Sequence, residues 1–191
     1  MYDVAIIGAG PAGASAAIFT AKAGKKTLVV DHDKGMTKKA WFENYYGITE
    51  ISGPELVETG IKQFQRLGAD LVEEEATEIK TNGDGTFTIT TSENKQFDAK
   101  HVILSTGVAL ALAEQLGVIT KPGTEPRIKT VLQVDEQGRT NIDGVWAAGT
   151  AAGVSVHAII TAGDGGKVAI NVISELNGER YVDHDIYQPN S

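Results

Sequence analysis

The chain has 191 residues, of which 41% are hydrophobic, enough for one compact domain with a core. Its formal net charge of −8 argues against a nucleic-acid-binding surface. The absence of cysteine excludes disulfides, thiol catalysis, cysteine-bound zinc and iron–sulfur clusters within this chain. The sequence shows neither a secretory leader pattern nor an apolar run of 18 or more residues, and we therefore expect a cytoplasmic protein.

The first 31 residues have the pattern of a dinucleotide-binding unit. Residues 2–7 form an apolar, β-branched run, which predicts a strand, and they lead into the turn Gly8-Ala9-Gly10-Pro11-Ala12-Gly13. An alanine-rich segment predicts a helix that ends at Gly24, and a second predicted strand, residues 27–30, ends on Asp31. The strand, glycine turn, helix, strand and acid therefore follow one another in the order that such a site requires.

Each glycine of the turn has a physical task in this interpretation. Gly8 permits the tight turn, Gly10 lets a pyrophosphate approach the backbone, and Gly13 lets the helix pack against the strands. The helix N-terminus favours phosphate groups, and Asp31 can accept hydrogen bonds from a ribose. The alternative is a glycine-rich turn that serves packing alone.

The middle of the chain predicts a helix and then a β-meander. Ser52-Gly53-Pro54-Glu55 is a capping box, and the helix that it begins ends at Gly68. Short strands separated by turns predict a three-stranded antiparallel meander over about residues 71–99. A separate buried strand over 101–104 then leads into Ser105-Thr106-Gly107.

The remainder predicts a short linker, one more strand and a long last helix. Residues 108–130 contain a short helical piece and a proline-containing loop. Residues 145–148 predict a strand, and Ser155 is expected to cap a helix over 157–176. Residues 1–178 are therefore expected to form a single domain, and residues 179–191 a polar, extended tail.

An aromatic cluster, residues 41–46, stands out in a chain with only 6% aromatic residues. It can be a small local core under a loop or a wall of the ligand cleft.

Together these segments resemble the FAD-binding domain of the low-molecular-weight thioredoxin reductases, within the pyridine nucleotide-disulfide oxidoreductases. The resemblance covers most of residues 1–175 and includes, beyond the glycine turn and Asp31, the segments 43–47, 52–56, 105–107 and 144–149. It implies an α/β fold, a Rossmann-like doubly wound parallel sheet with the β-meander. It also implies FAD as the cofactor and a homodimer.

The resemblance implies a contact role for individual positions of this chain. The glycine turn would hold the pyrophosphate, Asp31 the adenosine ribose, and the backbone at Ala76 the adenine. Asn44 would lie near the flavin or ribityl chain. The complete set of implied FAD contacts is Gly8, Gly10, Pro11, Ala12, Gly13, Asp31, Asn44, Ala76, Thr106, Gly107, Gly149, Thr150, His157 and Ala158.

Within that set, Thr106 and Gly107 would line the cleft, and Gly149 and Thr150 would approach the ribityl chain. His157 and Ala158 would cover the flavin pyrimidine, where a helix N-terminus stabilises the negative charge of a reduced flavin. The alternative for His157 is a helix-start histidine without a cofactor contact. No catalytic residue and no metal ligand is predicted.

This chain departs from the family pattern in ways that bear on function. The family inserts a pyridine-nucleotide domain with its redox Cys-x-x-Cys where this chain has only residues 108–130, too few for a domain of about 100 residues. Without cysteine, the chain by itself is not a thioredoxin reductase. Thr150 replaces the family's acid, and residues 32–39 do not match its Gly-Gly-Gln-Leu-type loop.

These observations leave alternatives open. The first is a single-domain flavoprotein that binds FAD and transfers electrons from an external reductant, such as NAD(P)H or a partner reductase, to an external acceptor. The second is a non-enzymatic regulatory or assembly module with a degenerate or adenine-nucleotide-binding cleft. A third is an NAD-binding dehydrogenase, which the meander and the second cleft segment disfavour. No membrane or nucleic-acid partner is expected, and enzymatic turnover is left open.

Overall fold

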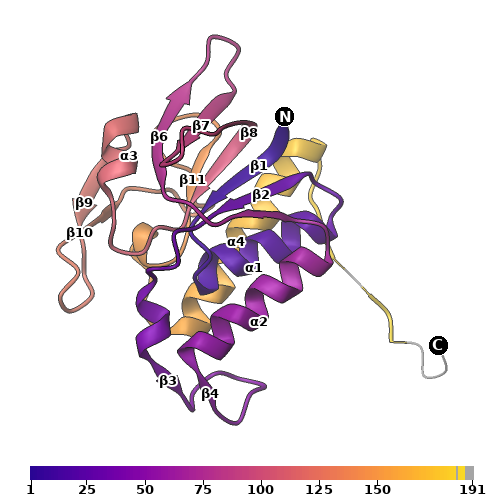
Figure 1. Cartoon of the computed structure of the whole chain (residues 1–191), viewed down its shortest axis with the longest axis vertical. Coiled ribbons are helices and arrows are strands. Elements are labelled where there is room, and N and C mark those ends of the chain that lie inside the picture. Colours follow the sequence, from indigo (N-terminus) through magenta and orange to yellow (C-terminus); the bar gives the residue numbers. More distant parts are fainter. Residues whose placement is uncertain (184, 188–191) are drawn as a thin grey trace.

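A computed structural model describes residues 1–183 and 185–187. Its centre is a parallel sheet with the strand order β5-β2-β1-β8-β11 (Figure 1). The strands are β1 (Tyr2–Ile7), β2 (Thr27–Val30), β5 (Asp70–Val72), β8 (Gln96–Leu104) and β11 (Val145–Ala147). Their side chains are mostly buried β-branched and aliphatic groups, as expected for parallel strands that are covered on both faces. This confirms the predicted Rossmann-like doubly wound sheet.

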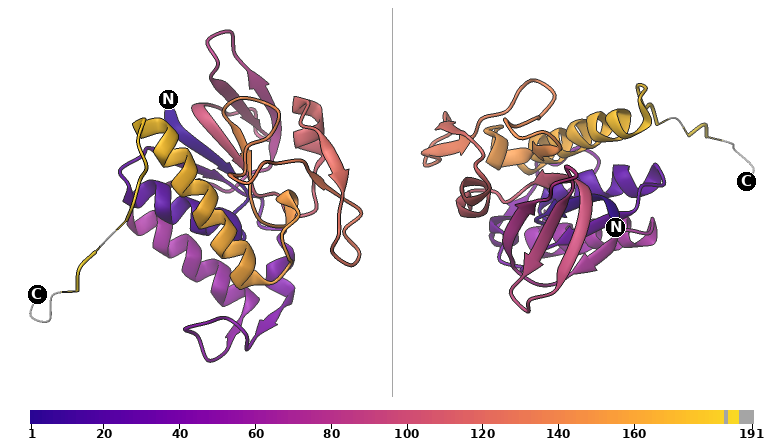
Figure 2. Two further views of the ribbon diagram at one scale, coloured as in Figure 1. Left: turned by 180° about the vertical axis from the view of Figure 1, so that it is seen from behind. Right: turned by 90° about the horizontal axis from the view of Figure 1, so that it is seen from above.

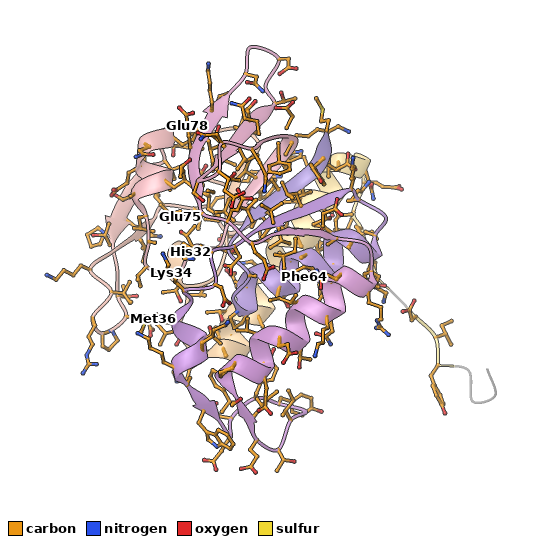
Figure 3. All side chains as sticks on the ribbon, viewed as in Figure 1. His32, Lys34, Met36, Phe64, Glu75 and Glu78 are labelled. Atoms are coloured by element: carbon orange, nitrogen blue, oxygen red, sulfur yellow. The ribbon has the colours of Figure 1, made fainter. Side chains whose placement is uncertain are left out.

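Three helices cover one face of this sheet, with α1 (Pro11–Lys22) lying between α4 (Ala158–Asn177) and α2 (Gly53–Arg66) (Figure 2). The side chains of Val4 and Ile6 on β1 point into this layer, because successive strand residues face opposite sides. Phe64 of α2 is fully buried in the same layer and is labelled in Figure 3.

The opposite face is covered by the meander and by the linker. β6 (Ala76–Thr81) and β7 (Phe87–Thr91) pair antiparallel with each other, and β7 pairs with the first half of β8. The linker contributes α3 (Ala111–Leu116) and the hairpin of β9 (Thr120–Pro122) and β10 (Thr130–Leu132). Buried side chains of these elements form one core with the side chains of the parallel strands that point away from the helices.

The meander differs in two ways from the predicted one. The predicted strands at 96–98 and 101–104 are one continuous strand, β8, because its polar residues alternate with buried Ala99 and do not interrupt it. The segment near residue 71 belongs to β5, which pairs in parallel with β2. The meander therefore begins at Ala76.

The linker also differs from the prediction. Its proline-containing segment, predicted as a loop, forms part of the β9–β10 hairpin.

Residues 36–52 form an arm that projects from the body at the bottom of Figure 1. It contains a short 3-10 helix, η1 (Met36–Lys39), and a two-stranded ladder of β3 (Trp41–Phe42) and β4 (Ile51–Ser52). Trp41 is 59% exposed and Tyr46 is 94% exposed, so the aromatic cluster is not a local core.

The C-terminal segment leaves α4 after Gly178, which ends the helix in a left-handed conformation. Lys22 of α1 forms ion pairs with Asp183 (3.0 Å) and Asp185 (2.6 Å) of this segment. Of the predicted tail, residues 184 and 188–191 lie outside the described residues. Within the described part of the chain, none of the helices combines the length and the apolar character needed to span a membrane.

A polar cluster joins β8, β11 and the end of α4 on the helical side of the sheet. The Trp146 Nε1–H group donates a hydrogen bond to His101 Nδ1 (3.2 Å), and the Arg139 guanidinium lies 4.6 Å from the Trp146 ring centroid. Arg139 also donates to Glu175 Oε2 (2.8 Å). Burial lowers the pKa of His101, although the negative charges of Glu175 and Asp143 oppose this effect.

This cluster predicts a loss of stability in mild acid. Because the folded protein lowers the pKa of His101, the unfolded chain takes up this proton first as pH falls below about 6.5, the ordinary histidine pKa. The contribution of His101 to stability is therefore present at neutral pH and decreases below it. We expect urea midpoints to fall between pH 7.5 and 5.5, and His101→Gln to reduce that fall. The exposed His32→Gln serves as the control, and an equal fall in all three proteins would contradict the assignment.

Candidate functional site

The candidate site is the crevice at the carboxyl ends of the parallel strands. The chain leaves β1 toward β2 on one side, whereas β8 and β11 lie on the other side of β1. In open parallel sheets, ligands bind at such a change of direction. The segments that follow these strands carry the glycine turn, Asp31, Thr106 with Gly107, and Gly149 with Thr150.

In the first turn, packing requires glycine at two of the three glycine positions, and the third glycine has open space beside it. Gly8 has φ +104°, and a Cβ atom there would lie 2.6 Å from the Ser105 carbonyl oxygen. A Cβ atom at Gly13 would overlap the Gly8 carbonyl oxygen. At Gly10 it would meet only Thr37 Oγ1, at 4.0 Å. The space beside Gly10 is therefore open to a ligand, as close approach of a pyrophosphate would require.

Asp31 supports this turn from the end of β2. Its Oδ1 accepts a hydrogen bond from the Ala9 N–H group (2.9 Å), and its Oδ2 accepts one from Asp33 (2.8 Å). A carboxylate can accept about four hydrogen bonds, so Asp31 retains capacity for a ribose hydroxyl. Its position beside Ala9 places that capacity next to Gly10.

Two helices begin at the crevice without a side-chain cap, and this distinguishes them from α2. Within residues 1–183 and 185–187, no side chain caps the first turn of α1, which starts after Gly10, or of α4, which starts after His157. By contrast, Ser52 and Glu55 close the N-terminus of α2 with a complete capping box. The N–H groups at the starts of α1 and α4 are thus available to negatively charged groups.

The second chain segment of the site interlocks with the first. Gly149 has φ +71°, and a Cβ atom there would lie 2.7 Å from Ala12 Cβ. A Cβ atom at Gly165 of α4 would overlap the Ala12 carbonyl oxygen. The Gly149 N–H group donates to Asp164 Oδ2 (2.8 Å), and Asp164 Oδ1 pairs with Lys167 Nζ (2.9 Å). Gly149 is therefore fixed against both helices.

Sequence reasoning did not single out Asp164, although a signal was present. Asp164 and Lys167 are the charged residues of the otherwise uncharged stretch 158–174, three positions apart. The side chain of Asp164 is only 8% exposed, which sequence alone does not reveal.

Three other predicted site residues lie on further segments of the chain. Thr106 follows β8, and among the described residues its buried Oγ1 has no hydrogen-bond partner. Asn44 is exposed on the arm, whose Tyr45 borders a cavity of about 180 Å³ together with Gly10 and Pro11. Ala76 begins β6, where it pairs with Thr91.

His157 is the N-cap residue of α4, and Ala158 is the first helical residue. Ser155, predicted as the cap, is not the N-cap residue, because the helix starts three residues after it, at Ala158. Its hydroxyl instead contacts His157 Nδ1 at 2.8 Å. The His157 carbonyl accepts a hydrogen bond from Thr161, whose side chain borders Gly149, so the start of α4 lies beside the second segment.

The segments that follow β2 and β5 lie at one end of the crevice. Figure 3 labels His32 and Lys34 on the segment after β2, and Glu75 on the segment after β5. The hydrogen bond from the Asp31 N–H group to the Val72 carbonyl (3.0 Å) joins these two segments. This is the end at which the resemblance places the adenosine.

Comparison with known proteins agrees with this geometry. The family model described as pyridine nucleotide-disulphide oxidoreductase matches residues 2–108 and 48–166. Thioredoxin reductase of Aquifex aeolicus is 40% identical over 115 residues, which cover 56% of this chain and 34% of that protein. For the enzyme of Mycolicibacterium smegmatis the values are 38% over 129 residues, 65% and 39%. The matched region thus spans between a third and two fifths of these relatives' length.

Solved structures show the same fold. A thioredoxin reductase from Gloeobacter violaceus has a TM-score of 0.80 at 19% identity, covering 98% of this chain and 99% of that chain. The atypical thioredoxin reductase of Desulfovibrio vulgaris Hildenborough has a TM-score of 0.77 at 23% identity, covering 94% and 99%.

The glycine turn yields a prediction about stability. Gly13→Ala should lower the free energy of unfolding by about 3 kcal/mol or more, because the new methyl group overlaps backbone that cannot move away easily. Gly10→Ala should lower it by no more than about 1 kcal/mol, because the methyl group enters open space at φ −65° and only the preference for glycine at the helix N-cap is lost. Urea denaturation of both variants measures the difference. Equal stabilities would show that the turn is not packed as described.

Proposed function

This chain belongs to the pyridine nucleotide-disulphide oxidoreductase family, and from that premise we propose that its crevice binds FAD as a single-domain flavoprotein. The observation that carries the proposal is the open space at Gly10, beside the uncapped start of α1. Gly8 and Gly13 are required by the protein's own packing, whereas no packing contact requires the absence of a side chain at Gly10, which leaves room for a ligand. The chemistry of that ligand follows from free N–H groups and a helix N-terminus, which suit a pyrophosphate.

The residues of the crevice fit the two halves of such a dinucleotide. The glycine turn and Asp31 would hold the pyrophosphate and the adenosine ribose. The buried Thr106 hydroxyl, which has no hydrogen-bond partner among the described residues, and the Gly149–Thr150 backbone would serve the flavin half. When bound, FAD would supply the electron-transfer chemistry, and the protein would bind and orient it.

The start of α4 would stabilise negative charge on the flavin pyrimidine. Its uncapped N–H groups and the helix dipole favour an anionic group at His157 and Ala158. A reduced flavin carries that charge more readily, so this contact would favour reduction of the bound cofactor.

We do not propose thioredoxin reductase activity, which is the activity named for the relatives, for this chain alone. The matched relatives are about three times as long as the matched region, and this chain has no cysteine to reduce a disulfide. Electrons would therefore come from a separate reductant, either NAD(P)H or a partner reductase, and pass to a separate acceptor. A second copy of the chain is the partner that the family resemblance suggests.

FAD binding can be tested directly. We expect the purified protein to keep flavin absorbance after incubation with FAD and desalting. Gly10→Val should lower the FAD affinity at least about tenfold at unchanged stability, because its side chain fills the space intended for the pyrophosphate. Gly83→Val, in the distant β6–β7 turn and also in open space, is the matched control. Unchanged flavin content in Gly10→Val would refute the site assignment.

Thr150 offers a second test, which also addresses the alternative function. If the Gly149–Thr150 turn approaches the ribityl chain, Thr150→Asp should tighten FAD binding about three- to tenfold, because a charged acceptor forms stronger hydrogen bonds. Fluorescence titration with FAD measures the change. Equal or weaker binding would favour the non-enzymatic regulatory or assembly module with a rebuilt cleft.

A further inference from the structure

Asp164 is a buried carboxylate that reaches from α4 into the second segment of the site. Its side chain is 8% exposed, and its Oδ2 accepts the hydrogen bond of the Gly149 N–H group at 2.8 Å. Its Oδ1 lies 2.9 Å from the Lys167 ammonium. Both oxygens are thus engaged, and one of them holds backbone that directly precedes Thr150.

The packing around Gly149 leaves this hydrogen bond to set the orientation of the peptide group in the turn. The left-handed φ of +71° depends on glycine, and Ala12 occupies the space beside its Cα. Thr161 of α4 lies 3.6 Å from the position that a Cβ atom of residue 149 would take. Since packing fixes the Cα position, the Asp164 carboxylate determines the orientation of the peptide that joins Ala148 to Gly149.

The charge of Asp164 also lies close to the proposed flavin half. Thr150 is neutral, so Asp164 supplies a negative charge to this part of the crevice, and Lys167 offsets it from one side. Removing either partner changes the local charge by one unit, in opposite directions. A purely mechanical support would not have this property.

We propose that Asp164 is a positioning residue for the flavin half of the cofactor. It orients the Gly149–Thr150 backbone through the Gly149 amide, and together with Lys167 it sets the charge at that half. This inference rests on the proposed FAD binding. It assigns no contact between Asp164 and the cofactor itself.

The test uses four variants of the full chain and two probes. Asp164→Ala removes the acceptor and the charge, Asp164→Asn keeps an acceptor for the Gly149 amide, and Lys167→Gln removes the opposite charge. Glu175→Gln, about 16 Å further along α4, is the control for a helix residue that also accepts hydrogen bonds. Dissociation constants are measured for FAD, which would fill both halves of the crevice, and for ADP, which would fill the adenosine half alone.

The expected result separates the two halves. Asp164→Ala weakens FAD binding about tenfold but leaves ADP binding within about twofold of the wild type, because the glycine turn is unaffected. Asp164→Asn stays within about threefold for FAD. The midpoint potential of bound flavin rises in Asp164→Asn and falls in Lys167→Gln, since loss of a nearby negative charge favours the reduced flavin and loss of a positive charge disfavours it. Glu175→Gln changes none of these values.

Each contrary outcome has a distinct meaning. Wild-type FAD affinity in Asp164→Ala would overturn the inference while leaving the proposed function intact. Equal weakening of FAD and ADP would assign Asp164 to general folding and overturn it as well, as would potentials that move in the same direction in Asp164→Asn and Lys167→Gln. A wild-type protein that binds ADP but not FAD would reject the proposed function and the inference together.

Discussion

Helix α1 is held by backbone contacts on both of its sides, and the site depends on this. On the sheet side, the Gly8 carbonyl oxygen occupies the place where Gly13 would carry a Cβ atom. On the other side, the Ala12 carbonyl oxygen fills the corresponding place at Gly165 of α4. Contacts of this kind tolerate little adjustment, because the displaced atom would be backbone. The start of α1 is therefore fixed to β1 and to α4 at once.

This double contact explains how residues from distant parts of the chain form one crevice. Gly149 is separated from the glycine turn by more than a hundred positions, yet its space is limited by Ala12. The same packing brings the starts of α1 and α4 to the carboxyl edge of the sheet, where neither has a side-chain cap from the part of the chain that the structure describes. The electrostatic character of the crevice, two helix N-termini and one buried carboxylate, is thus a consequence of helix packing.

The sequence was sufficient for the fold and for the order of the site segments, but not for the task of each residue. The glycine turn is recognisable because strand, helix and acid surround it. Whether a glycine serves packing or a ligand depends on atoms from other elements, such as Ser105 opposite Gly8, and these are invisible in a local pattern. The continuity of β8 was missed because the polar residues of its first half read as the end of a short strand, whereas its pairing with β7, β1 and β11 is a tertiary fact. Asp164 was missed because its burial and its Gly149 partner are tertiary facts.

The linker between Gly107 and β11 completes the second core of the sheet. Leu110, Ala113 and Val118 of the linker are buried with Leu132 in the core on the meander side of the sheet. These side chains cover apolar strand residues such as Leu104 that would otherwise face water, at a gain of about 25 cal/mol per Å² of apolar surface buried. The linker is therefore an integral layer of the fold. Because it begins directly after Thr106 and Gly107, its packing also fixes that side of the crevice.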